Sequence, residues 1–423
     1  MKHVLNNWWP LAASWLLMSI ELPAVSAVVA RLADPTVHLA AYGGIVFPLA
    51  LLIEAPIIML LAASTALSRD AASYHRLRRY MMVSGAFLTG LHILIAFTPL
   101  YYVVVEGLIG APAEVVEPAR IGLMIMTPWT WSIASRRFHQ GVLIRFGRSR
   151  LVSVGTLVRL LVDIGLLLAG YLLYDLAGIV VATVAVAAGV MAEALYIGIK
   201  VRPVVRKHLG EPDPKAAPLH LRAFLNFYIP LALTSLMTLV IQPIGSAALS
   251  RMPYALESLA VWPVVFGFIF LLRSLGLAYQ EVVVAMLEIP GNEDALRRFS
   301  LILTAVTTGL LILVAATPLS RLWFETVSGL RPELSDLARS GLWFGILLPA
   351  LSVLKNWFQG ILVHARRTRS ITEAVTLFVL TCGILLWIGV RWVSMPGLYW
   401  GLGAFSVAAV IQALWVWRRS RQL

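Results

Sequence analysis

The chain has 423 residues, of which 60% are hydrophobic and only 13% are charged, whereas a soluble protein carries about 25% charged residues. This composition excludes an ordinary soluble protein, and the single cysteine, Cys382, excludes a disulfide framework and a cysteine-type zinc site. The net charge of +13 would suit a nucleic-acid partner, but the basic residues gather in loops between apolar stretches. We therefore expect no nucleic-acid partner.

Twelve apolar stretches follow one another along the chain, each long enough to cross a bilayer as a helix of about 20 residues. The first is too long for the apolar region of a signal peptide, and no cleavage motif follows it. Their approximate limits are 8–31, 38–65, 80–105, 118–140, 151–173, 176–200, 222–250, 255–286, 298–319, 334–363, 370–392 and 396–418. The sequence predicts an all-α polytopic membrane protein with twelve transmembrane helices in the lipid bilayer.

The loops differ strongly in charge. One side holds 22 of the 34 lysines and arginines, while the other holds few, among them Arg31, Arg120 and Arg251. Because basic loops stay in the cytoplasm, we expect the first side to be cytoplasmic. Both termini are then cytoplasmic, which twelve spans allow, and we expect the protein in the inner or plasma membrane of the cell.

The chain repeats itself. The stretch "HQGVLIRFGRSR" (139–150) returns as "FQGILVHARRTR" (358–369), and "WPLAASWLLMSIELPAVSAVVAR" (9–31) returns as "IPLALTSLMTLVIQPIGSAALSR" (229–251). The offset is 220 positions in the first span and 219 afterwards. Each half holds six spans, so both halves insert the same way up, as in parallel transporter repeats. We predict two pseudo-symmetric six-helix lobes, 1–200 and 222–423, joined by a polar cytoplasmic linker, 201–221.

Several cations lie inside predicted spans, where charge is costly and often functional. Arg136 and Arg137 fall in the fourth span, Arg273 in the eighth, and Lys355 with Asn356 in the tenth. In the repeat register Lys355 corresponds to Arg136 and Asn356 to Arg137. Guanidinium and ammonium groups suit a phosphate or carboxylate ligand, so these five residues are the predicted binding site for an anion. The alternative is that the cations near span ends reach lipid phosphates.

Carboxylates also occur in the spans and are candidates for coupling to Na⁺ or H⁺. The strongest are Glu21 before Pro23, Glu54, and Asp163. Asp163 is four residues from Arg159 on one helix, so the two can simply neutralise each other. Glu193 and Glu281 lie nearer span ends and are weaker candidates.

Common catalytic motifs are absent. The sequence has no G-x-x-x-x-G-K-[ST], no H-E-x-x-H and no G-x-S-x-G, so we predict that the protein is not an enzyme. Channels are usually rings of identical subunits, whereas a duplicated chain encloses its own cleft. We expect a monomer that needs no cofactor apart from a coupling ion.

The span pattern, the cytoplasmic linker and the stretch "LNFYIPLALTSLMTLVIQPIGSAALSR" (225–251) resemble the multidrug/oligosaccharidyl-lipid/polysaccharide (MOP) flippase superfamily. Within it, 225–251 and the region around "HQGVLIRFGRSRLV" are similar to the progressive ankylosis family. The resemblance implies a MATE-like fold and export of an anion such as pyrophosphate, a nucleotide or citrate. A flippase for a lipid-linked pyrophosphate precursor and a MATE-like exporter of organic cations remain alternatives. The major facilitator signature between spans 2 and 3 is missing.

Overall fold

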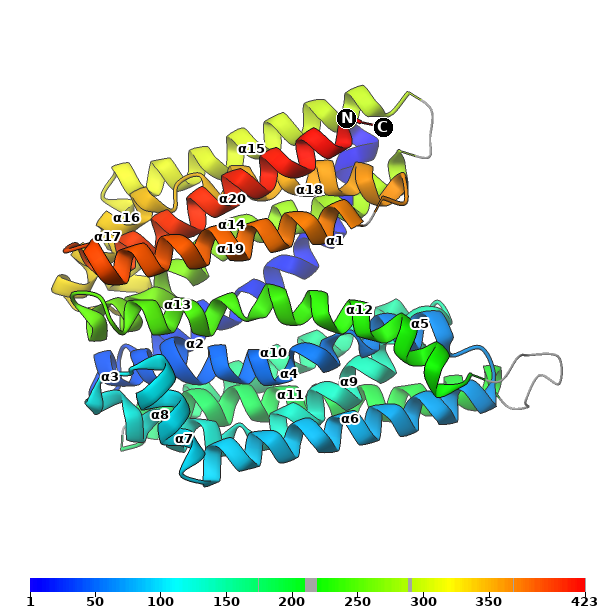
Figure 1. The fold of residues 1–423 in the computed structure, drawn as a ribbon, viewed down its shortest axis with the longest axis horizontal. Coiled ribbons are helices and arrows are strands. Elements are labelled where there is room, and N and C mark those ends of the chain that lie inside the picture. The colour runs from blue at the N-terminus through cyan, green and yellow to red at the C-terminus, as the bar shows by residue number, and fades with distance from the viewer. Residues whose placement is uncertain (174, 210–218, 288–290, 368, 423) are drawn as a thin grey trace. The chain divides into compact units, whose positions relative to one another are not determined.

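The computed structural model describes residues 1–173, 175–209, 219–287, 291–367 and 369–422, and all regular elements in these ranges are helices (Figure 1). The helices of the first half are α1 (Lys2–Ser19), α2 (Glu21–Val29), α3 (Pro35–Leu39), η1 (Ala40–Val46), α4 (Phe47–Ile58), α5 (Leu60–Leu67), α6 (Ala71–Phe97), α7 (Leu100–Tyr102), η2 (Val103–Ile109), α8 (Ala113–Ile125), α9 (Thr127–Arg145), α10 (Ser149–Leu173) and α11 (Gly178–His208). Those of the second half are α12 (Leu221–Leu239), α13 (Ile241–Leu249), α14 (Ala255–Met286), α15 (Glu293–Ala316), α16 (Leu319–Arg321), η3 (Leu322–Val327), α17 (Pro332–Phe344), α18 (Leu348–His364), α19 (Arg369–Trp392) and α20 (Gly397–Ser420). The predicted all-α class is confirmed.

Eleven helical segments among the described residues are long and apolar enough to cross a membrane. The twelfth predicted span, 118–140, is helical as α8 and α9, but the helix breaks at Met126 and carries Arg136 and Arg137. The two arginines make this segment less apolar than the others. Their charges must be offset by other side chains inside the membrane. The chain is a multi-pass membrane protein.

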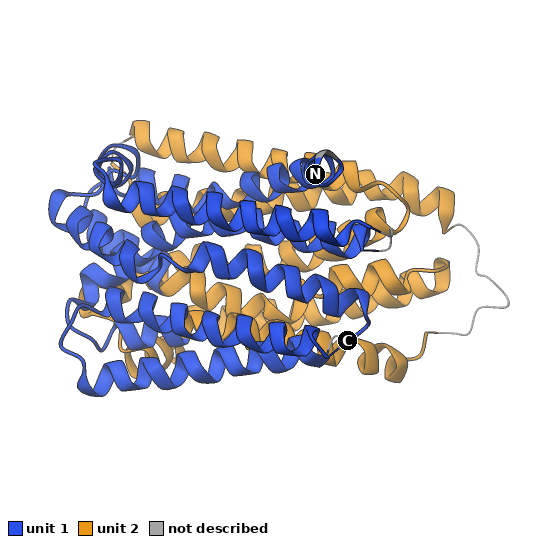
Figure 2. Ribbon diagram, turned by 90° about the horizontal axis from the view of Figure 1, so that it is seen from above, with its two compact units in different colours: residues 1–44, 244–423 blue, residues 45–243 orange. Residues whose placement is uncertain are grey.

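The described helices form two compact units (Figure 2). Unit 1 contains residues 1–44 and 244–423, and unit 2 contains 45–243. Within unit 1, α1 packs against α14, and within unit 2, α12 packs against α4. The first long helix of each sequence half thus packs on the second span of the other half. The predicted lobes, which follow the duplication rather than packing, stay a prediction. Residues 210–218 of the expected linker lie outside the described residues.

Prolines explain why the first span of each half is broken. A proline ring clashes with the carbonyl group four residues earlier and offers no N–H to it. Pro23 and Pro243 therefore end α1 at Ser19 and α12 at Leu239, in each case four residues before the proline. The duplicated proline produces the same break twice.

Helix boundaries repeat at the offsets seen in the sequence. The left-handed residues Asp34 and Tyr254 are 220 positions apart, whereas α6 and α15 end at Phe97 and Ala316, 219 apart. The first half therefore contains one extra residue between these points. The π-helix η1 lies in this interval, whereas α14 is α-helical throughout the equivalent stretch. Since a π-turn holds one residue more than an α-turn, η1 accommodates the insertion and preserves the register after it.

The glycine of the repeated Q-G motif permits close helix packing. A Cβ atom at Gly141 would overlap the carbonyl oxygen of Leu61 and the hydroxyl of Ser64, both on α5. A Cβ atom at the equivalent Gly360 would overlap the side chain of Val283 on α14. Only glycine lets α9 approach α5, and α18 approach α14, this closely.

Gly141→Ala is therefore expected to lower the free energy of unfolding by about 1–3 kcal/mol, the usual cost of overpacking. Thermal unfolding of the detergent-purified variant measures this. Gly165→Ala on α10 is the matched control, because a Cβ atom there meets only open space and little change is expected. Equal effects of the two substitutions would contradict the packing explanation.

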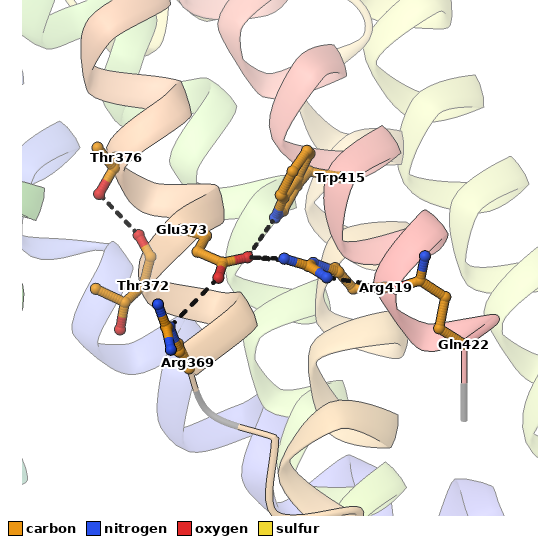
Figure 3. Close-up of polar contacts among 7 residues, drawn as sticks. All are labelled: Arg369, Thr372, Glu373, Thr376, Trp415, Arg419 and Gln422. Atoms are coloured by element: carbon orange, nitrogen blue, oxygen red, sulfur yellow. Dashed lines mark hydrogen bonds and ion pairs between the residues drawn. The ribbon is translucent and has the colours of Figure 1, made fainter.

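Glu373 ties α19 to α20 (Figure 3). Its carboxylate accepts hydrogen bonds from the Arg419 guanidinium, at 2.7 Å, and from the Trp415 indole, at 3.3 Å. Arg369, one turn earlier on α19, lies 3.6 Å from the same carboxylate. These contacts fasten the last two helices at the basic end of unit 1.

Candidate functional site

The main buried polar centre of unit 2 surrounds Glu193 of α11, a residue with no exposed surface. Arg136 of α9 lies 2.5 Å from Glu193 Oε2, and Gln140, one turn later, donates to Oε1 at 3.0 Å. From α10, Thr156 donates to Oε1 at 3.4 Å, and Arg159 Nε lies 3.9 Å from Oε2. We call these five residues the Glu193 cluster. In it, the Glu193 carboxylate offsets positive charge that would otherwise be costly inside the membrane.

Asp163 lies buried next to this cluster, 1% exposed. Its carboxylate rests on Gly189 of α11, where a Cβ atom would overlap it. The helices α10 and α11 pack side by side, so Gly189 creates the space in which a carboxylate sits between them. The expected neutralisation of Asp163 by Arg159 stays a prediction.

Arg137 and Glu54 also belong to unit 2. Glu54 of α4 is 4% exposed, and Arg137 of α9 is partly buried. The charge of Arg137 interacts with the carboxylates of Glu54 and Glu193. The Nε atom of Arg137 is buried without a hydrogen-bond partner among the described residues. Arg137 therefore keeps a buried donor without a partner, as Arg136 does at its own Nε atom.

Arg273 of α14 and Lys355 of α18 form the corresponding centre of unit 1, which we call the Arg273–Lys355 pair. They are close enough for the charge of Arg273 to act on Lys355. Ser352, one turn before Lys355, donates to the backbone oxygen of Arg273 at 3.1 Å and joins the two helices. The Arg273 guanidinium also lies over the Phe266 ring, 5.7 Å from its centre. Among the described residues, no carboxylate lies within ion-pairing distance of either cation.

Asn356 follows Lys355 on α18 and is 1% exposed. Its side-chain amide donates to the backbone oxygen of Ser352 at 2.8 Å. The amide nitrogen thus already has a partner on its own helix.

The repeat register shows how the two centres differ. In unit 2 six buried or partly buried positions carry three carboxylates and three arginines: Glu54, Arg136, Arg137, Arg159, Asp163 and Glu193. The equivalent positions 219 residues later carry two cations and no carboxylate: Arg273, Lys355, Asn356, Phe378, Cys382 and Gln412. These six positions therefore carry a formal net charge of zero in unit 2 and +2 in unit 1.

The predicted coupling carboxylates fall in both units. Glu54 and Asp163 belong to unit 2, and Glu21 begins α2 in unit 1. Glu21 is partly buried. No group of three or more His, Cys, Asp or Glu side chains that could hold a metal ion occurs among the described residues.

Sequence reasoning underestimated Glu193 and missed Gln140 and Thr156. A signal for Glu193 and Gln140 was present in the repeat: Gln140 belongs to the Q-G motif, and Glu193 aligns with the buried Gln412. Comparing ionisable residues of one half with their neutral equivalents in the other would have pointed to Glu193. Thr156 aligns with Val375 and gave no such signal.

No protein-family model and no curated protein matches the sequence. Solved structures match in fold. A multidrug resistance MATE family transporter of the MOP superfamily, in its inward-facing conformation, aligns with a TM-score of 0.73 and 15% identity over 97% of this chain and 95% of that one. The lipid II flippase MurJ, in an inward closed conformation, aligns with a TM-score of 0.74 and 18% identity over 97% and 87%.

A MOP superfamily transporter from Pyrococcus furiosus, described by the reverse polarity of its binding pocket, aligns with a TM-score of 0.62 and 17% identity over 99% and 95%. At these identities the likeness establishes the fold. The chain has the MATE-like fold of MOP superfamily proteins, as the sequence predicted. The resemblance to the progressive ankylosis family stays a prediction.

Proposed function

We propose that the chain is a secondary transporter that moves an anionic solute across the membrane by alternating access, with the anion held by the Arg273–Lys355 pair. The fold supports the general part of this proposal, since MATE transporters and MurJ share it. In duplicated transporters the binding site lies near the membrane midplane and opens alternately to either side. We further propose that both termini lie in the cytoplasm, because the basic loops belong there.

The observation that supports an anionic substrate is the uncompensated positive charge of the Arg273–Lys355 pair. Two like charges in a medium of low dielectric constant repel each other strongly, and here no carboxylate among the described residues offsets them. An anion bound between them would remove this repulsion. Arginine can grip a phosphate or carboxylate with two hydrogen bonds, and lysine adds a point charge.

The equivalent centre in unit 2 has a different role in this proposal. Arg136 is already engaged by Glu193, so it stabilises the fold rather than holding substrate. Asn356 of unit 1 stays a candidate for a further contact to the anion, and the predicted role of Arg137 in anion binding stays a prediction. A binding pocket of reverse polarity has been described for another protein of this fold, which supports the idea that the polarity of the pocket can differ between proteins of this fold.

Coupling to Na⁺ or H⁺ is assigned to the carboxylates Glu21, Glu54 and Asp163. A carboxylate inside a membrane protein can take up a proton or coordinate a cation. Binding of such an ion would change the local charge and bias the equilibrium between the two access states, as any ligand with different affinities for the two states does.

Transport by purified protein in proteoliposomes tests the proposal. Uptake of labelled pyrophosphate, citrate and a nucleotide is compared with uptake of the organic cation tetraphenylphosphonium. Arg273→Ala and Lys355→Ala are each expected to reduce anion transport at least about tenfold, because a hydrogen bond to a charged group contributes about 1.5–3 kcal/mol. Arg297→Gln, an exposed substitution on α15, is the control and should transport normally.

Other outcomes would overturn the proposal. Normal anion transport by both variants would remove the Arg273–Lys355 pair from the site. Transport of the organic cation alone would favour the MATE-like alternative. Movement of a lipid-linked pyrophosphate between leaflets, without uptake of soluble anions, would favour the flippase alternative.

A further inference from the structure

A groove of about 590 Å³ opens on the side of unit 2, between α6, α9 and α11. It is separate from the Glu193 cluster, whose members do not line it. Its lining changes character along its length: one end is polar and basic, and the other is apolar. Both ends are formed by residues of α6, α9 and α11.

The basic end is formed by Arg78 of α6 and Arg202 of α11, which are both exposed, with Tyr74 and His139 beside them. Both guanidinium charges act on the His139 ring, so both arginines lie near this ring. No carboxylate lines the groove, and none among the described residues forms an ion pair with either arginine. The basic end of the groove therefore carries positive charge that can bind an anionic group.

The apolar end lies deeper in the membrane. Eleven residues of α11 separate Arg202 from Met191, which corresponds to about 16 Å along the helix. Met191 is 45% exposed, Leu195 is 67% exposed, and Trp131 of α9 lines the same end. A basic mouth at one membrane surface therefore continues into an apolar channel open to the acyl chains.

Several residues that line this groove are replaced by bulkier or apolar ones in the second half of the chain. Gly198, whose missing side chain leaves open space, corresponds to Trp417. The polar Ser135 and His139 correspond to Leu354 and Phe358. The equivalent of Arg202 is Arg421, whose guanidinium covers the Trp417 ring at 4.6 Å. The lining of the groove is thus specific to the first half and does not follow from the repeated fold alone.

We propose that this groove binds one anionic phospholipid of the leaflet at the basic end of the bundle, with its phosphate between Arg78 and Arg202 and an acyl chain along Leu195 and Met191. Basic pockets between transmembrane helices recognise acidic headgroups in this way. A free phosphate would use only the arginines and would leave the apolar channel to bulk lipid. The amphipathic shape therefore favours a lipid over a soluble anion.

Native mass spectrometry of the detergent-purified protein tests the proposal. The probes are dioleoyl phosphatidylglycerol, dioleoyl phosphatidylcholine and glycerol 3-phosphate, the last carrying a phosphate without a chain. One molecule of phosphatidylglycerol should remain bound, with at least tenfold preference over phosphatidylcholine, and glycerol 3-phosphate should not compete at equal concentration.

Two kinds of variant locate the site. Gly198→Trp places in the groove the residue that the second half carries and should abolish retention of the lipid, as should Arg78→Gln combined with Arg202→Gln. The matched control, Arg297→Gln combined with Arg421→Gln, removes the repeat-equivalent arginines and should retain the lipid. Unchanged retention by Gly198→Trp, or equal retention of both lipids, would overturn the proposal. Competition by glycerol 3-phosphate would replace the lipid with a soluble anion and overturn it too.

Discussion

Replacing Glu193 with leucine is expected to lower the free energy of unfolding by about 3–5 kcal/mol, or to prevent folding altogether. The reason is that Arg136 stays buried when its carboxylate partner is lost, and an uncompensated buried charge costs about this much. The hydrogen bonds from Gln140 and Thr156 are lost with it. Expression level and thermal unfolding in detergent measure the effect.

Gln412→Leu is the matched control for this substitution. Gln412 occupies the equivalent place on α20 and is also buried, 7% exposed, but no charged side chain among the described residues forms a hydrogen bond with it. The expected loss is correspondingly small, about 1 kcal/mol for a typical buried hydrogen-bonding group. If the two leucine variants lost equal stability, the Glu193 cluster would not be the electrostatic support of unit 2.

Introducing the missing carboxylate, Gln412→Glu, is expected to block anion transport. The repeat register places position 412 against Lys355 as Glu193 lies against Arg136, and α18 packs on α20 as α9 packs on α11. The new carboxylate would form an ion pair with Lys355 and would compete with the anionic substrate for its positive charge. It should also raise the melting temperature measured without anions, because it relieves the repulsion within the Arg273–Lys355 pair.

Gln422→Glu controls for the added charge itself. Gln422 is exposed next to Arg419 (Figure 3), so this variant places a carboxylate beside a surface arginine. It should transport normally. A Gln412→Glu protein that transports anions at the wild-type rate would show that position 412 does not face the binding site.

Much of the fold follows from patterns that local physics imposes. Apolar length predicts the spans, and Pro23 and Pro243 predict the broken first helix of each half. The change of offset from 220 to 219 was visible in the sequence, but its cause was not. Whether one extra residue forms a loop or a π-turn depends on packing on both sides of the insertion, and η1 became evident only from the structure.

The candidate site was predictable in its residue types but not in its pairings. Glu193 seemed near a span end because the apolar stretch stops near position 200, yet α11 continues to His208 and places Glu193 at mid-helix. Long basic side chains let a helix extend beyond its apolar segment. Arg136 and Lys355 looked equivalent, but only the structure shows that one has a carboxylate partner and the other has none among the described residues.

Isothermal titration with pyrophosphate, citrate and a nucleotide tests the central claim most directly, because it measures anion binding without membrane, gradient or coupling ion. We predict that at least one of these anions binds the wild-type protein and the Gln422→Glu control with equal affinity. Binding should weaken at least about tenfold in Lys355→Ala, Arg273→Ala and Gln412→Glu. Isotherms that are the same for all five proteins, or heat from none of the three anions, would contradict an anion site at the Arg273–Lys355 pair.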